Sequence, residues 1–199
     1  MNASLLQRDI NQVVIDMIKC PQTSTQSVYQ HGQSVNFHLI ELLSHLKNET
    51  SLENWKLPDW FKKHGKQILE NLHCEEILNQ YAVFHDIGKP YCIEYDSDGK
   101  KHFPNHAQVS KEIWLSTGGN EIVGNLIGWD MDIHTLSSEE IAKRCSEEWT
   151  REDAFSLLIT SLVEIHSNAK LFGGLESVSF KSKFKTVERR GNQICKFFL

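Results

Sequence analysis

The stretch YAVFHDIGKP (Tyr81–Pro90) places a histidine and an aspartate side by side at the end of a predicted helix. Gly88 and Pro90 follow, and both residue types end helices. Adjacent side chains on a helix diverge by about 100°. His85 and Asp86 can therefore face one point only where the backbone leaves the regular helix, which Gly88 permits. An imidazole and a carboxylate held this way can bind a metal ion, and the carboxylate can bridge two.

Most of the remaining chain has the apolar periodicity of helices, which predicts an all-α fold. Eleven Gly and four Pro are few for 199 residues and favour long uninterrupted elements. Patterns typical of capping boxes begin at Ser137 and Thr150 and predict two helix starts. The exception is residues 91–103, where alternation around Asp98-Gly99 predicts a short β-hairpin. Apolar residues recur three and four apart over residues 5–18, 26–46, 59–69, 75–84, 106–115 and 121–129.

The charge pattern limits the classes of partner. The net charge of −5 gives no bulk basic field for duplex DNA. Residues 176–199 nevertheless carry six Lys/Arg and two acids, while residues 1–175 have a net charge of −9. We therefore expect one domain over 1–175 and a basic C-terminal extension over 176–199 that packs on it or trails from it. No apolar run approaches 18 residues, so no membrane span is expected.

Cysteine usage and the N-terminus predict a cytoplasmic protein. The five cysteines are widely spaced, with no CxxC pair, which indicates reduced thiols and no zinc finger. Arg8, Asp9 and Asp16 interrupt the first 19 residues, so no secretory signal is expected there. The cysteines are Cys20, Cys74, Cys92, Cys145 and Cys195.

The opening stretch resembles the signature of HD-domain metal-dependent phosphohydrolases, most closely the branch attached to tRNA nucleotidyltransferases. Upstream, QHGQSV (30–35) contains His31, which matches that family's first ligand. Downstream, HFPNHAQVS (102–110) and LIGWDMDIH (126–134) resemble its next histidine-bearing segments. The resemblance covers roughly residues 27–175. It implies an HD-domain helical bundle of five or more core helices.

The resemblance also implies a ligand set for one or two divalent metal ions. His31, His85 and Asp86 would hold one ion. His106 and His134 would complete a second site that shares Asp86.

The family's final ligand is usually an aspartate on the last core helix, but here the helix reads SLVEIHSNA (161–169). His166 stands at the ligand position, and Glu164 is the alternative. An added imidazole would favour Ni, Co, Mn, Fe or Zn over Mg.

The chemistry that follows is phosphate-ester hydrolysis. A metal-bound water loses its proton near neutral pH and attacks phosphorus. Lys89 lies on the same turn and could bind phosphate as a point charge, so Asp86 and Lys89 are the expected catalytic residues. Asp130 and Asp132, near His134, could orient an imidazole.

The expected function is a phosphomonoesterase or phosphodiesterase acting on nucleotides or on RNA-end phosphates such as 2′,3′-cyclic phosphate. One alternative is a nucleotidase for free (deoxy)nucleotides or cyclic-nucleotide signals. Another is a catalytically silent HD fold that binds nucleic acid. In that case Lys181, Lys183 and Lys185, with Phe180 and Phe184 between them, could bind a nucleotide by charge and stacking.

The chain holds ten histidines, and the predicted ligand set takes up five of them. For the other five we expect no metal-binding role. These are His38, His45, His64, His73 and His102.

Overall fold

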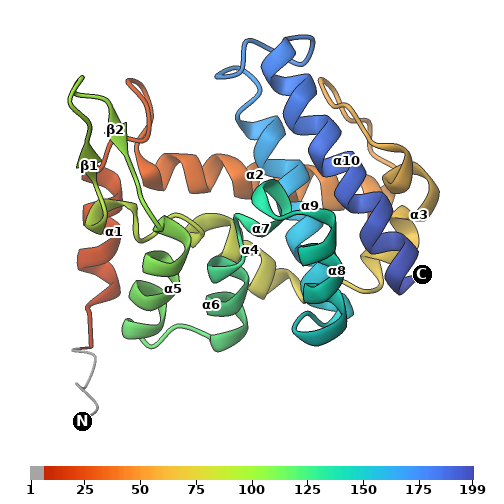
Figure 1. The fold of residues 1–199 in the computed structure, drawn as a ribbon, viewed down its shortest axis with the longest axis horizontal. Coiled ribbons are helices and arrows are strands. Elements are labelled where there is room, and N and C mark those ends of the chain that lie inside the picture. Colours follow the sequence, from red (N-terminus) through yellow and green to blue (C-terminus); the bar gives the residue numbers. More distant parts are fainter. Residues whose placement is uncertain (1–6) are drawn as a thin grey trace. The chain divides into compact units, whose positions relative to one another are not determined.

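The computed structural model describes residues 7–199, and its fold is all-α with one small hairpin, as expected. Two-residue strands β1 (Glu94–Tyr95) and β2 (Lys101–His102) pair antiparallel, and Gly99 in their turn has φ +74°. The predicted first helix began at residue 5, which lies outside the described residues. The helices are α1 (Ile10–Lys19), α2 (Val28–Asn48), α3 (Asp59–Leu69), α4 (Glu75–Phe84), the 3₁₀ helix η1 (Lys89–Tyr91), α5 (His106–Ser116), α6 (Glu121–Gly128), α7 (Asp132–Thr135), α8 (Ser138–Glu147), α9 (Arg151–Ser167) and α10 (Val178–Phe198) (Figure 1).

The chain divides into two compact units that alternate along the sequence. Unit 1 comprises the described residues up to 34 together with 76–130. Unit 2 comprises residues 35–75 and 131–199. Helix α2 contributes its first part to unit 1 and the remainder to unit 2. Among the described helices, none has the length and apolar character that crossing a bilayer requires.

Unit 1 is built from α1, the start of α2, α4, η1, the hairpin, α5 and α6. Helices α5 and α6 lie side by side, and α5 also contacts η1 (Figure 1). The apolar faces of these helices meet in a small core. Its fully or almost fully buried side chains include Met17, Tyr81, Ile87, Trp114 and Leu126.

Two glycines allow very close backbone approaches in unit 1. A Cβ on Gly32 would lie 2.0 Å from the carbonyl oxygen of Val83, so α2 and α4 touch through their backbones. A Cβ on Gly88 would lie 2.4 Å from the backbone nitrogen of Ser110 on α5. Any side chain at either position would push the two segments apart. These contacts bring three helices together immediately next to His31 and His85.

Unit 2 is organised around α9. The side chains from Ala154 to Val163 are all buried, as expected of a helix that is covered on all sides. Helix α10 packs against α9, α8 and α3. Phe180, Val187 and Ile194 supply its buried face. The basic segment after residue 176 therefore forms a packed helix of unit 2, although its sequence gave no firm secondary-structure prediction.

Both predicted capping boxes are confirmed, at Ser137 with Glu140 and at Thr150 with Asp153. The carboxylate of the second capping box also contacts a residue outside the box. The Asp153 carboxylate accepts hydrogen bonds from the backbone N–H and hydroxyl of Thr150 and lies 2.8 Å from Nε2 of His73. Burial raises the pKa of Asp153, but the hydrogen bonds from His73 and Thr150 outweigh it, and the pKa is lowered overall.

We expect Gly32→Ala to lower the free energy of unfolding by about 3 kcal/mol or more, because the new methyl group would meet backbone rather than a movable side chain. Urea unfolding followed by circular dichroism measures the change. Gly128→Ala is the control, because the three atoms nearest to a Cβ there all belong to the flexible Lys111 side chain, with Cδ closest at 2.8 Å. Equal stability of the two variants would contradict the backbone contact.

Asp153→Asn should destabilise the protein by about 1–2 kcal/mol at pH 7, because the start of α9 loses its charged cap. A lowered folded-state pKa means that the ionised carboxylate stabilises the fold above its ordinary pKa of about 4. This contribution is lost as pH falls through the folded-state value. Unfolding curves of the wild type and the variant should therefore converge at acidic pH, and a constant gap across pH would contradict the assignment.

Candidate metal centre

The backbone leaves the regular α-helix directly after α4. Adjacent residues such as His85 and Asp86 can face one point only with such a departure. The N–H of His85 still donates to the carbonyl of Tyr81, four residues back. The next bonds, from Ile87 to Phe84 and from Lys89 to Asp86, span only three residues. Both side chains of the His-Asp pair are buried, each 2% exposed. The turn therefore holds two polar groups inside unit 1.

Three imidazoles surround the Asp86 carboxylate in unit 1. Nε2 of His85 lies 3.2 Å from Oδ2, and Nε2 of His31 lies 3.8 Å from the same oxygen. Nε2 of His106 lies 3.8 Å from Oδ1. The His31 and His85 rings meet edge to face, with centroids 5.2 Å apart. Residues from α2, the turn after α4 and α5 thus converge on one carboxylate.

Two of these imidazoles are oriented by backbone carbonyls. Nδ1 of His85 lies 3.0 Å from the carbonyl oxygen of Ala82, and Nδ1 of His106 lies 3.0 Å from that of Phe103. In a neutral imidazole, Nδ1–H then donates to the carbonyl and Nε2 carries the lone pair. This is how proteins prepare histidine for a metal ion. In both residues, Nε2 is the atom nearest Asp86.

The spacing of the donor atoms suits a shared metal ion. Ligands about 2.0–2.2 Å from one ion lie roughly 3–3.5 Å from each other. The nitrogen-to-carboxylate distances of 3.2 and 3.8 Å are close to that range. Ligand atoms of His31 and His85 also lie within 4.8 Å of each other, so both can reach one ion. The donor set of three imidazoles and one carboxylate is that of a borderline transition metal.

Lys89 places a positive charge on the same carboxylate. Its Nζ lies 2.7 Å from Oδ2 of Asp86 and 3.2 Å from Oε1 of Gln22, in a largely buried position. Burial raises the pKa of Asp86, but Lys89, His85 and His31 lower it more, and the pKa lies well below its usual range. The carboxylate is therefore ionised and ready to bind a cation.

Phe103 links the hairpin to this site, a contact that the sequence reasoning missed. The ammonium groups of Lys89 and Lys101 each lie 5.2 Å from the centre of its ring. Lys101 also donates to the carbonyl of Pro21. Two cations thus gather where the hairpin meets the His-Asp turn. Phe103 belongs to the HFP triplet before His106, but its position in the sequence does not by itself predict a contact with Lys89 or Lys101.

Unit 2 pairs two of the other predicted ligands. Nε2 of His134, on the short helix α7, lies 3.4 Å from Oε2 of Glu164 on α9. Helix α7 is held at both ends. Arg144 pairs with Asp132 at 3.1 Å, and Arg190 donates to the carbonyl of Leu136. His134 therefore lies on a helical turn that is fixed at both ends, next to the Glu164 carboxylate.

His166 has a different environment from Glu164, although both are on α9. Its ring stacks on Trp55, with centroids 4.3 Å apart and planes 19° from parallel. Nδ1 lies 2.7 Å from the carbonyl of Leu162, and Nε2 accepts from the N–H of Lys56 at 3.1 Å. Burial lowers the pKa of His166 to about 4, so the ring is neutral at pH 7. With both nitrogens engaged, the His166 imidazole has no lone pair for a metal ion.

The two predicted orienting aspartates contact other side chains. Asp130 is buried in unit 1 and accepts a 2.7 Å hydrogen bond from the Tyr81 hydroxyl. Asp132, in unit 2, forms the pair with Arg144. Each thus has a structural role within its own unit.

The lysine and phenylalanine side chains of α10 are largely used within unit 2. Phe180 and Phe184 are buried and face His166, so their rings are not exposed for stacking on a base. Lys181 lies 2.7 Å from Glu176, and Lys183 lies over the ring of Phe172. The predicted nucleotide-binding role of this segment therefore loses its stacking component.

The five remaining histidines contact carboxylates, an amide, a backbone carbonyl or aromatic rings. His73 pairs with Asp153 and His102 with Asp96, each at 2.8 Å. The other three contact a glutamine, a backbone carbonyl or aromatic rings; they are His64, His45 and His38.

No family model, curated protein or solved structure matches the chain. The case for the metal centre therefore depends on the donor atoms themselves.

We expect His85→Gln to reduce the metal bound per chain at least tenfold, because the variant loses an oriented nitrogen donor. Inductively coupled plasma mass spectrometry on protein purified without chelator measures the content. His102→Gln is the matched control, since that histidine is half-exposed and bound to Asp96. Similar metal content in both variants would exclude His85 as a ligand.

Proposed function

We propose that the protein is a metal-dependent phosphohydrolase of the HD-domain kind, acting on phosphate esters of nucleotides or RNA ends. One observation carries the proposal. It is a buried, ionised carboxylate, Asp86, within 4 Å of three imidazole nitrogens and a lysine ammonium. Lys89 alone could neutralise the carboxylate, so the three additional imidazoles need another explanation, and imidazole with carboxylate is the donor set of a borderline transition metal.

In this proposal His31, His85, Asp86 and His106 hold the ion. An ion at such a site lowers the pKa of a bound water towards neutrality and draws charge from phosphoryl oxygens. His85 and His106 keep their lone pairs on the metal side through their carbonyl bonds. In unit 2, His134 and Glu164 form an imidazole–carboxylate pair of their own.

Lys89 would bind the substrate's phosphate. Its ammonium is a compact point charge that already contacts Asp86 and Gln22. Lys101, whose ammonium also lies over the Phe103 ring, adds a second positive charge at the hairpin. Two cations near an anionic substrate offset the charge of the phosphate and hold it for attack.

The imidazole-rich set favours Zn, Ni, Co, Fe or Mn over Mg, which prefers oxygen donors and retains its waters. The choice between RNA ends and free nucleotides depends on the shape of the surrounding surface. A substrate panel separates the two classes.

We expect metal-loaded protein to hydrolyse bis-p-nitrophenyl phosphate and at least one member of a panel of 2′,3′-cyclic nucleotides, nucleoside 2′-, 3′- and 5′-monophosphates and RNA with a 2′,3′-cyclic end. Asp86→Asn should reduce kcat by about 10³-fold or more, because the amide neither bridges a metal nor carries charge. Product release measured by chromatography gives the rate.

The control is Lys170→Gln, an exposed lysine in unit 2. It should retain wild-type turnover, with unchanged circular dichroism in both variants. Full activity of Asp86→Asn would remove the proposed centre. Absence of turnover across the whole panel with bound metal would instead favour the silent binding fold.

A further inference from the structure

Helix α10 concentrates positive charge in a protein whose net charge is negative. It holds six of the 21 basic residues of the chain and only one of the 26 acidic residues, Glu188. Its apolar face, with Phe180, Val187 and Ile194, is buried in unit 2. Arg190 is buried as well, whereas the other five basic side chains are exposed. The outer face of α10 is therefore a basic surface.

Four of the exposed basic side chains form a line along the helix. Residues that are four or seven apart lie on the same side of an α-helix. The line consists of Lys181, Lys185, Arg189 and Lys196. From Lys185 to Lys196 it extends about 17 Å along the helix axis. Like charges one turn apart destabilise a helix, so this arrangement favours a negatively charged partner.

Three members of this line have no carboxylate partner. Lys181 pairs with Glu176 at 2.7 Å. No ion pair among residues 7–199 involves Lys185, Arg189 or Lys196, which we call the basic ridge. The basic ridge therefore carries charge that the protein itself does not neutralise.

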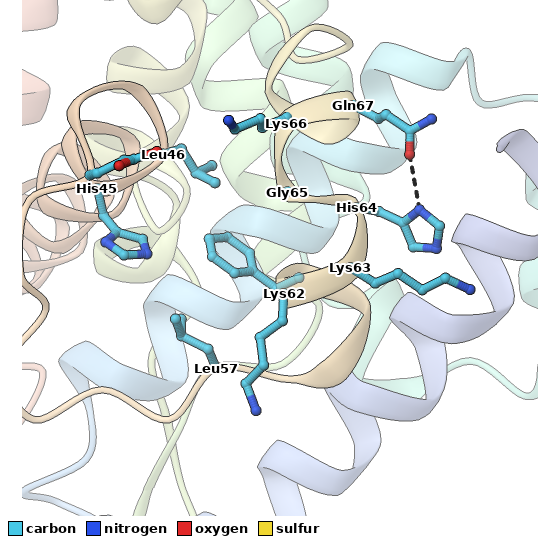
Figure 2. A pocket seen from close by; sticks show the side chains of 11 residues that line it. His45, Leu46, Leu57, Lys62, Lys63, His64, Gly65, Lys66 and Gln67 are labelled. Carbon is cyan, nitrogen blue, oxygen red and sulfur yellow. Dashed lines mark hydrogen bonds between the residues drawn. The ribbon is translucent and has the colours of Figure 1, made fainter.

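Helix α3 adds another positive charge beside the basic ridge. Trp60 of α3 packs so closely on α10 that a Cβ on Gly191 would lie 2.2 Å from the indole nitrogen. Burial raises the pKa of the Cys195 thiol on α10 to about 11, and the charge of Lys63 partly opposes this rise. Lys63 thus lies near α10. Figure 2 shows its side chain extending away from the pocket that His45 lines.

The length of the basic ridge suits a polyanion better than a small ligand. A single phosphate group can contact one or two of its charges. A nucleic-acid strand carries a negative charge about every 3.4 Å, so several of its phosphates fit along the ridge. A lipid surface is a poorer fit, because a helix binds a membrane through its apolar face, and that face of α10 lies in the core of unit 2.

We propose that the basic ridge and Lys63 bind a single strand of nucleic acid through its backbone phosphates. The contacts are charge-assisted hydrogen bonds, and phosphate contacts carry no sequence information. The ridge offers no aromatic ring for stacking on a base, so binding is independent of base identity. This surface belongs to unit 2 alone and does not rest on the proposed hydrolase activity.

The test is fluorescence anisotropy of the full chain with labelled oligo(U) of about 20 nucleotides, in the presence of chelator so that metal-dependent cleavage cannot occur. We expect the affinity to fall about 50-fold between 50 and 200 mM salt, as counterion release from four phosphate contacts requires. Oligo(dT) should bind alike. Uridine 5′-monophosphate at the same phosphate concentration should compete only weakly. Absence of oligo(U) binding at 50 mM salt, or equal competition by the mononucleotide, would overturn the proposal.

Charge variants locate the strand. Lys185→Gln/Arg189→Gln/Lys196→Gln should weaken oligo(U) binding at least tenfold and make the slope of log affinity against log salt shallower by about 2. Lys185→Arg/Lys196→Arg keeps the charges and should retain the affinity. The charge-matched control changes three exposed lysines outside α10 to Gln, and they are Lys19, Lys47 and Lys143. Equal weakening by the ridge variant and the control would show only a general charge effect and would overturn the proposal.

Two lysines of α3 provide a second test on one helix. Lys63→Gln should weaken oligo(U) binding severalfold. Lys66→Gln should have no effect, because this side chain extends towards Leu46 (Figure 2). Equal effects of the two variants would remove Lys63 from the surface. Vesicles of phosphatidylserine and phosphatidylcholine should not displace oligo(U), and displacement by them would assign the basic ridge to a membrane instead.

Discussion

The buried Asp86 carboxylate is the constraint on which the centre of unit 1 depends. A charge that is 2% exposed is strongly destabilising unless it is compensated. Here the compensation comes from Lys89 and from imidazoles on α2, the α4 turn and α5. His85 and Lys89 lie on the same turn as Asp86, whereas His31 and His106 must be brought in from α2 and α5. The packing of those segments therefore serves an electrostatic requirement as well as a hydrophobic one.

The two close backbone approaches meet that requirement. Gly32 follows His31 directly, and Gly88 lies two residues after Asp86. Contact at Val83 and at Ser110 allows helices to approach more closely than side chains would permit. The short Asp86 side chain can then reach the imidazoles directly. The rigidity of the site thus comes from the backbone, and the carbonyl bonds of His85 and His106 fix the rings on that frame.

The sequence predicted most of the helices because their apolar periodicity and caps are local signals. The hairpin turn at Asp98-Gly99 and the boxes at Ser137 and Thr150 are of this kind. The sequence did not predict α10. Lysines that alternate with Phe180 and Phe184 resemble an exposed basic tail, and only the packing of α10 against α9 shows that the two rings are buried. The sequence also missed the Phe103 contacts, since cation–ring pairs depend on tertiary proximity and have no sequence spacing.

The sequence predicts how two side chains lie relative to each other more surely where the chain geometry is short-range than where it depends on tertiary packing. His85 and Asp86 face one point because a single turn tightens, which one glycine indicates. The choice between Glu164 and His166 depends on which side of α9 each faces. The two residues are two apart on a helix, so their side chains diverge by about 200°. One then meets His134 while the other stacks on Trp55. An imidazole whose two nitrogens both bond to the backbone has no lone pair for a metal ion, whereas the Glu164 carboxylate faces an imidazole.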